Sequence, residues 1–215
     1  MELGLKGTKE LVSGGSRGIG RAILERMVAE VAAVAIFARG KEGVEQTVAD
    51  LGGASQVHGA SVDAADYEAV SRWVAESAAN LGGVDIVISN TSASASLESN
   101  PEAWRSNYDV DLMCAVAMAE TAHPWLQQSD AAALLQVATI TALEHHDMPV
   151  CASYGAIKAA TINHMAQLAQ RWGGEGIRAN SVSPGPIFVE GGAWDNIKQN
   201  YFELYERDRL AHPSQ

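Results

Sequence analysis

Tyr154 and Lys158 are the side chains of this 215-residue sequence whose types and spacing are best suited to acid–base chemistry. They are four positions apart, so on a helix the phenol and the ammonium lie on the same face. A neighbouring positive charge favours the phenolate, which makes the phenol a proton donor that works near neutral pH. The pair alone is a weak indication, because a lysine that extends past a half-buried tyrosine is common on helices.

A glycine-rich segment, Ser13-Gly14-Gly15-Ser16-Arg17-Gly18-Ile19-Gly20, follows a short apolar run and precedes an amphipathic stretch. Glycines let the backbone turn sharply and approach a pyrophosphate closely, and a helix N-terminus supplies N–H groups and the positive end of its dipole. The position between a first strand and a first helix therefore predicts a dinucleotide-binding loop.

The end of the second expected strand indicates which dinucleotide is bound. The segment Phe37-Ala38-Arg39-Gly40 has no acidic residue of the kind that holds the adenosine ribose hydroxyls of NAD. Arg39 can pair with a 2′-phosphate instead, and Arg17 can add a second positive contact. Both favour NADP over NAD; the alternative is that the two are solvated surface arginines.

The elements that must position these residues follow from alternating apolar runs and amphipathic stretches. Strands are expected at residues 11–13, 31–38, 55–62, 84–89, 133–138 and 177–182. Helices are expected at residues 21–30, 43–51, 67–81, 101–128 (with breaks near Asn107 and Pro124) and 153–172. This order predicts an α/β fold with a Rossmann-type doubly wound parallel sheet of six strands, in a single NAD(P)-binding domain over residues 1–215.

Composition narrows the function classes. A formal net charge of −11 disfavours general nucleic-acid binding. No apolar run is long enough for a membrane span, and the N-terminus lacks a signal-peptide pattern, so the cytoplasm is expected. Cys114 and Cys151 have neither metal-ligand spacing nor a disulfide pattern, and no metal site is expected.

With the glycine loop and the Tyr154/Lys158 pair both in place, residues from about 5 to about 194 resemble the short-chain dehydrogenase/reductase family, in particular its 3-oxoacyl-ACP-reductase-like members. The resemblance implies a nicotinamide dinucleotide and a Ser-Tyr-Lys-Asn catalytic set. Asp63 would accept a hydrogen bond from adenine, Lys158 would hold the nicotinamide ribose, and Ile187 would contact the carboxamide. The implied cofactor-binding residues are Ser13, Gly14, Ser16, Arg17, Gly18, Ile19, Gly20, Arg39, Asp63, Ala64, Asn90, Tyr154, Lys158, Pro184, Gly185 and Ile187.

Other positions depart from the family pattern. Asp111 stands where the catalytic Asn is expected, and it could hold the same water of a proton relay while altering the local charge. The catalytic Ser is replaced by Thr139 if the strand is aligned, or by Thr141 if the spacing to Tyr154 is used. In an extended segment the two hydroxyls point the same way, so either can reach a substrate carbonyl. Ser92 stands where the family has Gly, and Val189 stands where the family often has Thr.

Together these residues predict an NADP(H)-dependent oxidoreductase that interconverts a small-molecule carbonyl and a secondary alcohol by hydride transfer, with Tyr154 as general acid and base. The alternative is a catalytically weakened dinucleotide-binding sensor or scaffold of the same fold, which the substitutions at the Ser and Asn positions favour. His145-His146-Asp147 is expected in a loop over the site, either solvated or in contact with substrate.

The C-terminal part is expected to control substrate access. Residues 186–215 correspond to the family's substrate lid, and Trp194, Tyr201, Phe202 and Tyr205 could cover an apolar substrate or pack in a subunit contact. The family usually continues through a seventh strand after these residues, so the sixth strand is expected at an edge that either the rest of a longer chain or another subunit covers. A homodimer or homotetramer is expected through residues 102–127 and 153–172.

Overall fold

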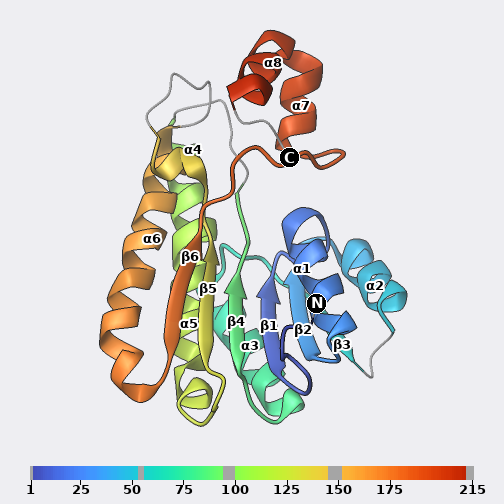
Figure 1. Cartoon of the computed structure of the whole chain (residues 1–215), viewed down its shortest axis with the longest axis vertical. Coiled ribbons are helices and arrows are strands. Elements are labelled where there is room, and N and C mark those ends of the chain that lie inside the picture. The colour runs from blue at the N-terminus through green and yellow to red at the C-terminus, as the bar shows by residue number, and fades with distance from the viewer. Residues whose placement is uncertain (1, 53–55, 94–99, 145–151, 212–215) are drawn as a thin grey trace.

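The computed structural model describes residues 2–52, 56–93, 100–144 and 152–211 (Figure 1). Among these residues, six parallel strands form one sheet in the order β3-β2-β1-β4-β5-β6. This confirms the predicted doubly wound sheet, and the order reverses between β1 and β4, where such sheets bind ligands. The strands are β1 (Lys9–Ser13), β2 (Ala33–Ala38), β3 (Val57–Ser61), β4 (Ile86–Ser89), β5 (Ala133–Val137) and β6 (Arg178–Val182).

Helices connect the strands and cover both faces of the sheet. The α-helices are α1 (Gly18–Ala29), α2 (Lys41–Asp50), α3 (Tyr67–Leu81), α4 (Pro101–Asn107), α5 (Cys114–Leu126), α6 (Ala152–Trp172), α7 (Ala193–Asn200) and α8 (Phe202–Ala211). Between them lie the π-helix η2 (Tyr108–Met113) and two 3₁₀ turns, η3 (Ile140–Ala142) and η4 (Gly173–Glu175). The helix expected from residue 21 begins earlier, at Gly18, because the glycine loop itself forms its first turn.

The strands are buried on both faces, so successive residues enter different cores. Val12 and Ile36 pack with Leu24 of α1 and Val44 of α2 on one face. Leu11 and Phe37 point to the other face, which α3, α5 and α6 cover, and the Phe37 ring meets the Trp73 ring edge-on at 4.7 Å (Figure 1). Lys158 of α6 is fully buried, which is rare for a charged side chain unless it is paired.

The predicted long helix at residues 101–128 is a series of three helical segments. Its expected break near Asn107 is a change of winding, because the chain continues with α-helical dihedral angles into η2 and α5. The break expected at Pro124 is wrong, because α5 continues through this proline and ends two residues later, at Leu126. A proline there costs the helix the hydrogen bond of its missing N–H, but almost no helix follows that a kink could redirect.

The helices α7 and α8 lie beyond the carboxyl ends of the strands, at the same end of the molecule as the start of α1 (Figure 1). Neither was predicted as a helix from the sequence. Trp194 and Tyr205 pack together between them, with ring centroids 6.4 Å apart. Among the described residues, no helix is both long and apolar enough to cross a membrane.

Candidate functional site

A cavity of about 540 Å³ lies at the carboxyl ends of the central strands. The glycine loop, the residues after β2, Ala64, the segment 90–92 and residues 187–194 form its walls. The predicted loop residues Gly14, Ser16, Arg17, Gly18 and Ile19 line it directly. The cavity therefore lies where the strand order reverses and where a helix N-terminus begins.

The glycine loop turns sharply where it leads into α1. Gly14 and Gly18 have φ values of +67° and +58°, in the left-handed region that glycine adopts without strain. Gly20 does not line the cavity, but a Cβ there would overlap the Gly14 carbonyl oxygen, so glycine lets α1 approach the loop. Arg17 is the N-cap of α1, and its side chain makes no capping hydrogen bond. The first N–H groups of the helix are therefore not capped by that side chain, and such groups can bind an anion.

Ser13 acts through the backbone of the neighbouring strand. Its buried hydroxyl oxygen accepts hydrogen bonds from the N–H groups of Asn90 (2.9 Å) and Thr91 (3.2 Å). Asn90 in turn donates from Nδ2 to the carbonyl oxygens of Ser13 and Gly14. Ser13 thus positions the wall of the cavity without lining it, whereas Asn90 and Thr91 do line it.

The predicted adenosine contacts are divided between residues inside and outside the cavity. Arg39 and Ala64 line it, and Arg39 is exposed. The Asp63 carboxylate instead accepts the N–H of Ala65 at 3.0 Å, within its own turn, and lies outside the lining. The predicted roles of Asp63 toward adenine and of Arg39 toward a phosphate both stay predictions.

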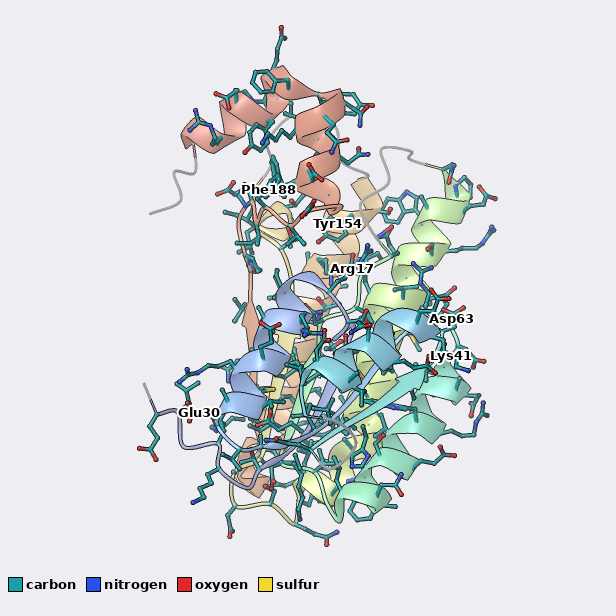
Figure 2. All side chains as sticks on the ribbon, turned by 90° about the vertical axis from the view of Figure 1, so that its right-hand side faces the viewer. Arg17, Glu30, Lys41, Asp63, Tyr154 and Phe188 are labelled. Atoms are coloured by element: carbon teal, nitrogen blue, oxygen red, sulfur yellow. The ribbon has the colours of Figure 1, made fainter. Side chains whose placement is uncertain are left out.

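Lys158 and Tyr154 lie in the first two turns of α6. Tyr154 is half-buried, and Figure 2 shows it at the end of the molecule that carries α7 and Arg17, opposite Glu30. Lys158 is only 1% exposed, and its Nζ donates to the carbonyl oxygens of Thr91 (3.2 Å) and Val137 (3.1 Å). Because Thr91 lines the cavity, this contact joins the helix that carries the predicted acid–base pair to the wall of the cavity.

Asp111 lies beside Lys158, in the π-helix η2. Its Oδ1 forms an ion pair with Lys158 Nζ at 2.9 Å, although the approach falls short of hydrogen-bond geometry. Its Oδ2 accepts hydrogen bonds from Asn107 Nδ2 and from the N–H of Ala93, both at 3.2 Å. Asn107 Oδ1 accepts from the Ser153 hydroxyl at 3.2 Å, so this network reaches the residue before Tyr154.

Asn107 and Ser153 are the two polar side chains of this network that the sequence interpretation missed. Both are buried, with exposed fractions of 1% and 0%. The four-residue spacing of Asn107 and Asp111 was the available signal, because it puts both side chains on one helical face.

Thr139 and Thr141 lie together, but in a different backbone conformation from the expected one. The expected extended segment is wrong after Thr139, because residues 140–142 form the 3₁₀ turn η3, which Thr139 caps. Thr139 Oγ1 donates to Thr141 Oγ1 at 3.3 Å and accepts the Thr141 N–H at 3.3 Å. A Cβ at Gly155 would lie 2.8 Å from the Thr141 carbonyl oxygen, so glycine beside Tyr154 lets η3 pack against α6.

The segment after β6 forms the remaining wall. Ile187 lines the cavity as predicted, whereas Pro184 and Gly185 do not; the Pro184 carbonyl instead accepts the N–H of Ile140 at 3.0 Å. Glu190 and Trp194 also line the cavity, and Glu190 is the one acidic residue of its described lining. His145, His146, Asp147 and Cys151 lie outside the described residues.

Neither a reactive thiol nor a metal-binding cluster is found among the described residues around the site. The buried Cys114 thiol, with Sγ 3.4 Å from Thr91 Oγ1, has its pKa raised to about 11 by burial, so it stays neutral at physiological pH. No group of three His, Cys, Asp or Glu side chains within the described part of the chain is arranged to hold a metal ion.

Comparisons with known proteins agree with this geometry. Residues 9–198 match the sequence pattern of the short chain dehydrogenase family. The chain is 34% identical to an isoepoxydon dehydrogenase of Penicillium expansum, over 98% of this chain and 82% of that protein. It is 27% identical to a 3-oxoacyl-[acyl-carrier-protein] reductase of Chlamydia muridarum, over 95% of this chain and 85% of that protein. The structure of an L-sorbose reductase from Gluconobacter frateurii, in complex with NADPH and L-sorbose, superposes with a TM-score of 0.83 at 26% identity, over 96% of this chain and 81% of that one.

Proposed function

The chain belongs to the short-chain dehydrogenase family, and we propose that it is an NADP(H)-dependent oxidoreductase that interconverts a carbonyl and a secondary alcohol with Tyr154 as general acid and base. The observation that carries the proposal is the hydrogen bond from Lys158 Nζ to the carbonyl oxygen of Thr91. It connects the Tyr154/Lys158 turn with a residue that lines the dinucleotide-sized cavity.

Each catalytic residue has a separate task in this proposal. When bound, NADPH would supply the hydride that reaches the carbonyl carbon. Tyr154 gives its phenolic proton to the carbonyl oxygen and takes a proton back from solvent, or runs these steps in reverse for an alcohol. The Thr139 or Thr141 hydroxyl donates to the same oxygen and stabilises the charge that develops there. Lys158 supplies the positive charge that favours the phenolate.

Two arginines support NADP as the cofactor. Arg17 and Arg39 both line the cavity and are exposed, and within the described part of the chain neither has an ion-pair partner. The segment Phe37-Ala38-Arg39-Gly40 at the end of β2 has no acidic residue of the kind that an NAD-binding site uses there. The structurally similar sorbose reductase was solved with NADPH, which favours the same cofactor here.

The remaining expectations belong to the same proposal. Residues 1–215 form one NAD(P)-binding domain in which residues 186–215 are the substrate lid, since Ile187 and Trp194 already line the cavity. The small-molecule substrate enters between this lid and α6. The functional form is a homodimer or homotetramer, in which α5 and α6 contact a second copy.

Turnover of a substrate panel tests the proposal. Oxidation of NADPH and NADH would be followed with isoepoxydon-type ketones, 3-oxoacyl thioesters and ketoses such as L-sorbose, because the similar proteins are named for these compounds. We expect NADPH-dependent turnover of at least one class, and its loss in Tyr154→Phe with cofactor affinity retained. Tight NADPH binding without turnover of any carbonyl would support a sensor instead, and full activity of Tyr154→Phe would refute the assigned acid.

A further inference from the structure

The charge of Lys158 is compensated inside the protein. The Lys158 ammonium and the Asp111 carboxylate are each 1% exposed and lie 2.9 Å apart. An ion pair this deeply buried is screened little by solvent, so the carboxylate offsets most of the field of the ammonium. The family resemblance places an uncharged amide at this position, so the compensation is a property of this chain.

The direction of the Asp111 carboxylate is set by its other contacts. Asn107 Nδ2 and the N–H of Ala93 both donate to Oδ2, which leaves Oδ1 beside Lys158. Asn107 is itself fixed, because its Oδ1 accepts from the Ser153 hydroxyl. A half-satisfied buried carboxylate would be costly, so these donors make the charged form of Asp111 tolerable in the core.

Other charged or titratable groups on the surrounding elements do not take over this role. Cys114 of α5 lies close enough to interact with both charges, but burial raises the pKa of its thiol to about 11 and keeps it neutral. Asp109 of η2 is partly exposed, and Glu102 and Arg105 of α4 pair with each other on the surface. Within the described part of the chain, Glu120 of α5 pairs with Arg171 of α6, and His123 of α5 pairs with Glu175 of η4. Other charged or titratable groups there are Glu144 after η3, His164 of α6 and Arg178 of β6, and each is partly or fully exposed.

We propose that Asp111 offsets most of the charge of Lys158 in this site and that Asn107 is the positioning residue that holds the carboxylate against it. Tyr154 lies four residues before Lys158 on α6, on the same helix face. An offset ammonium favours the phenolate less than an unopposed one. The site is therefore better suited to the step in which Tyr154 gives a proton to a carbonyl oxygen than to alcohol oxidation, which starts from the phenolate. This inference rests on the proposed function, since it names the direction in which that site works.

A pH titration of tyrosinate absorbance tests the inference without turnover. The signal of Tyr154 is the difference between the protein and its Tyr154→Phe variant, measured in each background. In Asp111→Asn, the midpoint of this signal should move to lower pH, by on the order of one unit, because the carboxylate no longer opposes the ammonium. The pH at which the rate of alcohol oxidation rises should shift to lower pH by the same amount.

Asp109→Asn is the matched control, because it removes the same formal charge two residues earlier on η2 from a partly exposed position. The midpoint of the tyrosinate titration in this variant should equal that of the unmodified protein. Asn107→Ala keeps both charges but removes the donor to Oδ2, so it should shift the midpoint in the same direction by less than Asp111→Asn. It also serves as the second variant if Asp111→Asn fails to fold by circular dichroism.

An unchanged midpoint in folded Asp111→Asn, or in Asn107→Ala, would overturn the inference. So would a shift in Asp109→Asn as large as that in Asp111→Asn. The two proposals fail distinguishably: a protein that turns over no substrate but shows the shift loses the proposed function and its direction, and keeps only the offset of the Lys158 charge by Asp111. A protein that turns over NADPH without the shift loses only the inference.

Discussion

Asn90 Nδ2 donates a hydrogen bond to the carbonyl oxygen of Gly14 at 3.1 Å, which joins the turn after β4 to the glycine loop after β1. The two residues are 76 positions apart in the sequence, but β1 and β4 are neighbours at the centre of the sheet. The shape of the predicted phosphate-binding loop is therefore set partly by a side chain from the other half of the fold.

Gly20→Ala should disrupt this junction. A Cβ at position 20 would overlap both the Gly14 carbonyl oxygen and Asn90 Nδ2, and neither the backbone atom nor the hydrogen-bonded amide can move freely. We expect a loss of about 1–3 kcal/mol in the free energy of unfolding, as overpacking usually costs. NADPH affinity should fall at least about tenfold if the displaced loop loses one charge-assisted hydrogen bond. Urea unfolding and NADPH fluorescence titration measure the two effects.

Gly173→Ala is the control for this substitution, because a Cβ there meets nothing within 4 Å and the residue lies in η4. It should leave both NADPH affinity and stability nearly unchanged. If Gly20→Ala binds NADPH as tightly as the control, the close approach of α1 to the loop is not needed for the cofactor.

Arg39→Ala should change cofactor preference rather than activity in general. Arg39 is exposed and lines the cavity at the end of β2, where a 2′-phosphate would lie in the proposed complex. A lost charge-assisted contact is worth about 1.5–3 kcal/mol, so NADPH affinity should fall by about 10- to 100-fold while NADH affinity is unchanged. Isothermal titration with both cofactors measures this, with Arg72→Ala on the exposed surface of α3 as the control. Equal losses of affinity for NADPH and NADH would show that Arg39 does not bind the 2′-phosphate.

Much of the fold could be predicted from the sequence because its signals are local. Short apolar runs such as Ile86–Ser89 are long enough only for buried strands, and the amphipathic stretch Tyr67–Leu81 ends at Gly82, whose φ of 71° suits a helix C-terminus. The helices α7 and α8 were harder to predict. Trp194 and Ile197 lie three residues apart on one face of α7, but this helix has only eight residues, too few for the helical period to stand out. The sequence of α8 is rich in charged and aromatic residues and has no apolar stripe.

Candidate site residues could be predicted only where they belong to a contiguous sequence motif. The Tyr154/Lys158 turn and the glycine loop are contiguous patterns, and the structure places the loop at the cavity. The contact of Asn107 with Ser153 crosses 46 residues and depends on how η2 packs against α6, which no local pattern encodes. Asp63 shows the opposite case: its carboxylate accepts the N–H of Ala65 within its own turn, a local contact, and it does not line the cavity.

Valine substitutions should show which threonine replaces the family serine. Thr139 Oγ1 both donates to Thr141 Oγ1 and accepts the Thr141 N–H, so it anchors η3 as well as presenting a hydroxyl. Thr139→Val should lower kcat by about 100-fold, the usual effect of losing a donor to a developing oxyanion. Thr141→Val leaves that anchor in place and should lower kcat by about tenfold. The two nearly isosteric variants control for each other, and a larger loss in Thr141→Val would assign the role to Thr141.

Glu10 is a buried carboxyl group for which the proposed mechanism has no use. It lies in β1 with 0% exposure, and Thr8 Oγ1 donates to its Oε1 at 2.7 Å. The pKa of Glu10 is raised from 4.5 to about 7: burial, the largest cause, raises it, the hydrogen bond from Thr8 lowers it, and the negative charge of Asp85 adds to the rise. The folded protein therefore binds this proton more tightly than the unfolded chain does.

Glu10→Gln should change how stability depends on pH. Because the folded-state pKa is the higher one, the protonated Glu10 contributes stability below about pH 4.5, and this contribution is lost as pH rises to about 7. The gap between the two pKa values corresponds to about 3 kcal/mol. The amide cannot ionise, so the variant should lose less stability than the unmodified protein between pH 4.5 and 7 and be more stable at pH 8, by up to about 3 kcal/mol. Urea unfolding at several pH values measures this, with the exposed Glu76→Gln as the control. If Glu10→Gln and Glu76→Gln follow the same pH dependence, the Glu10 carboxyl does not hold its proton in the folded protein.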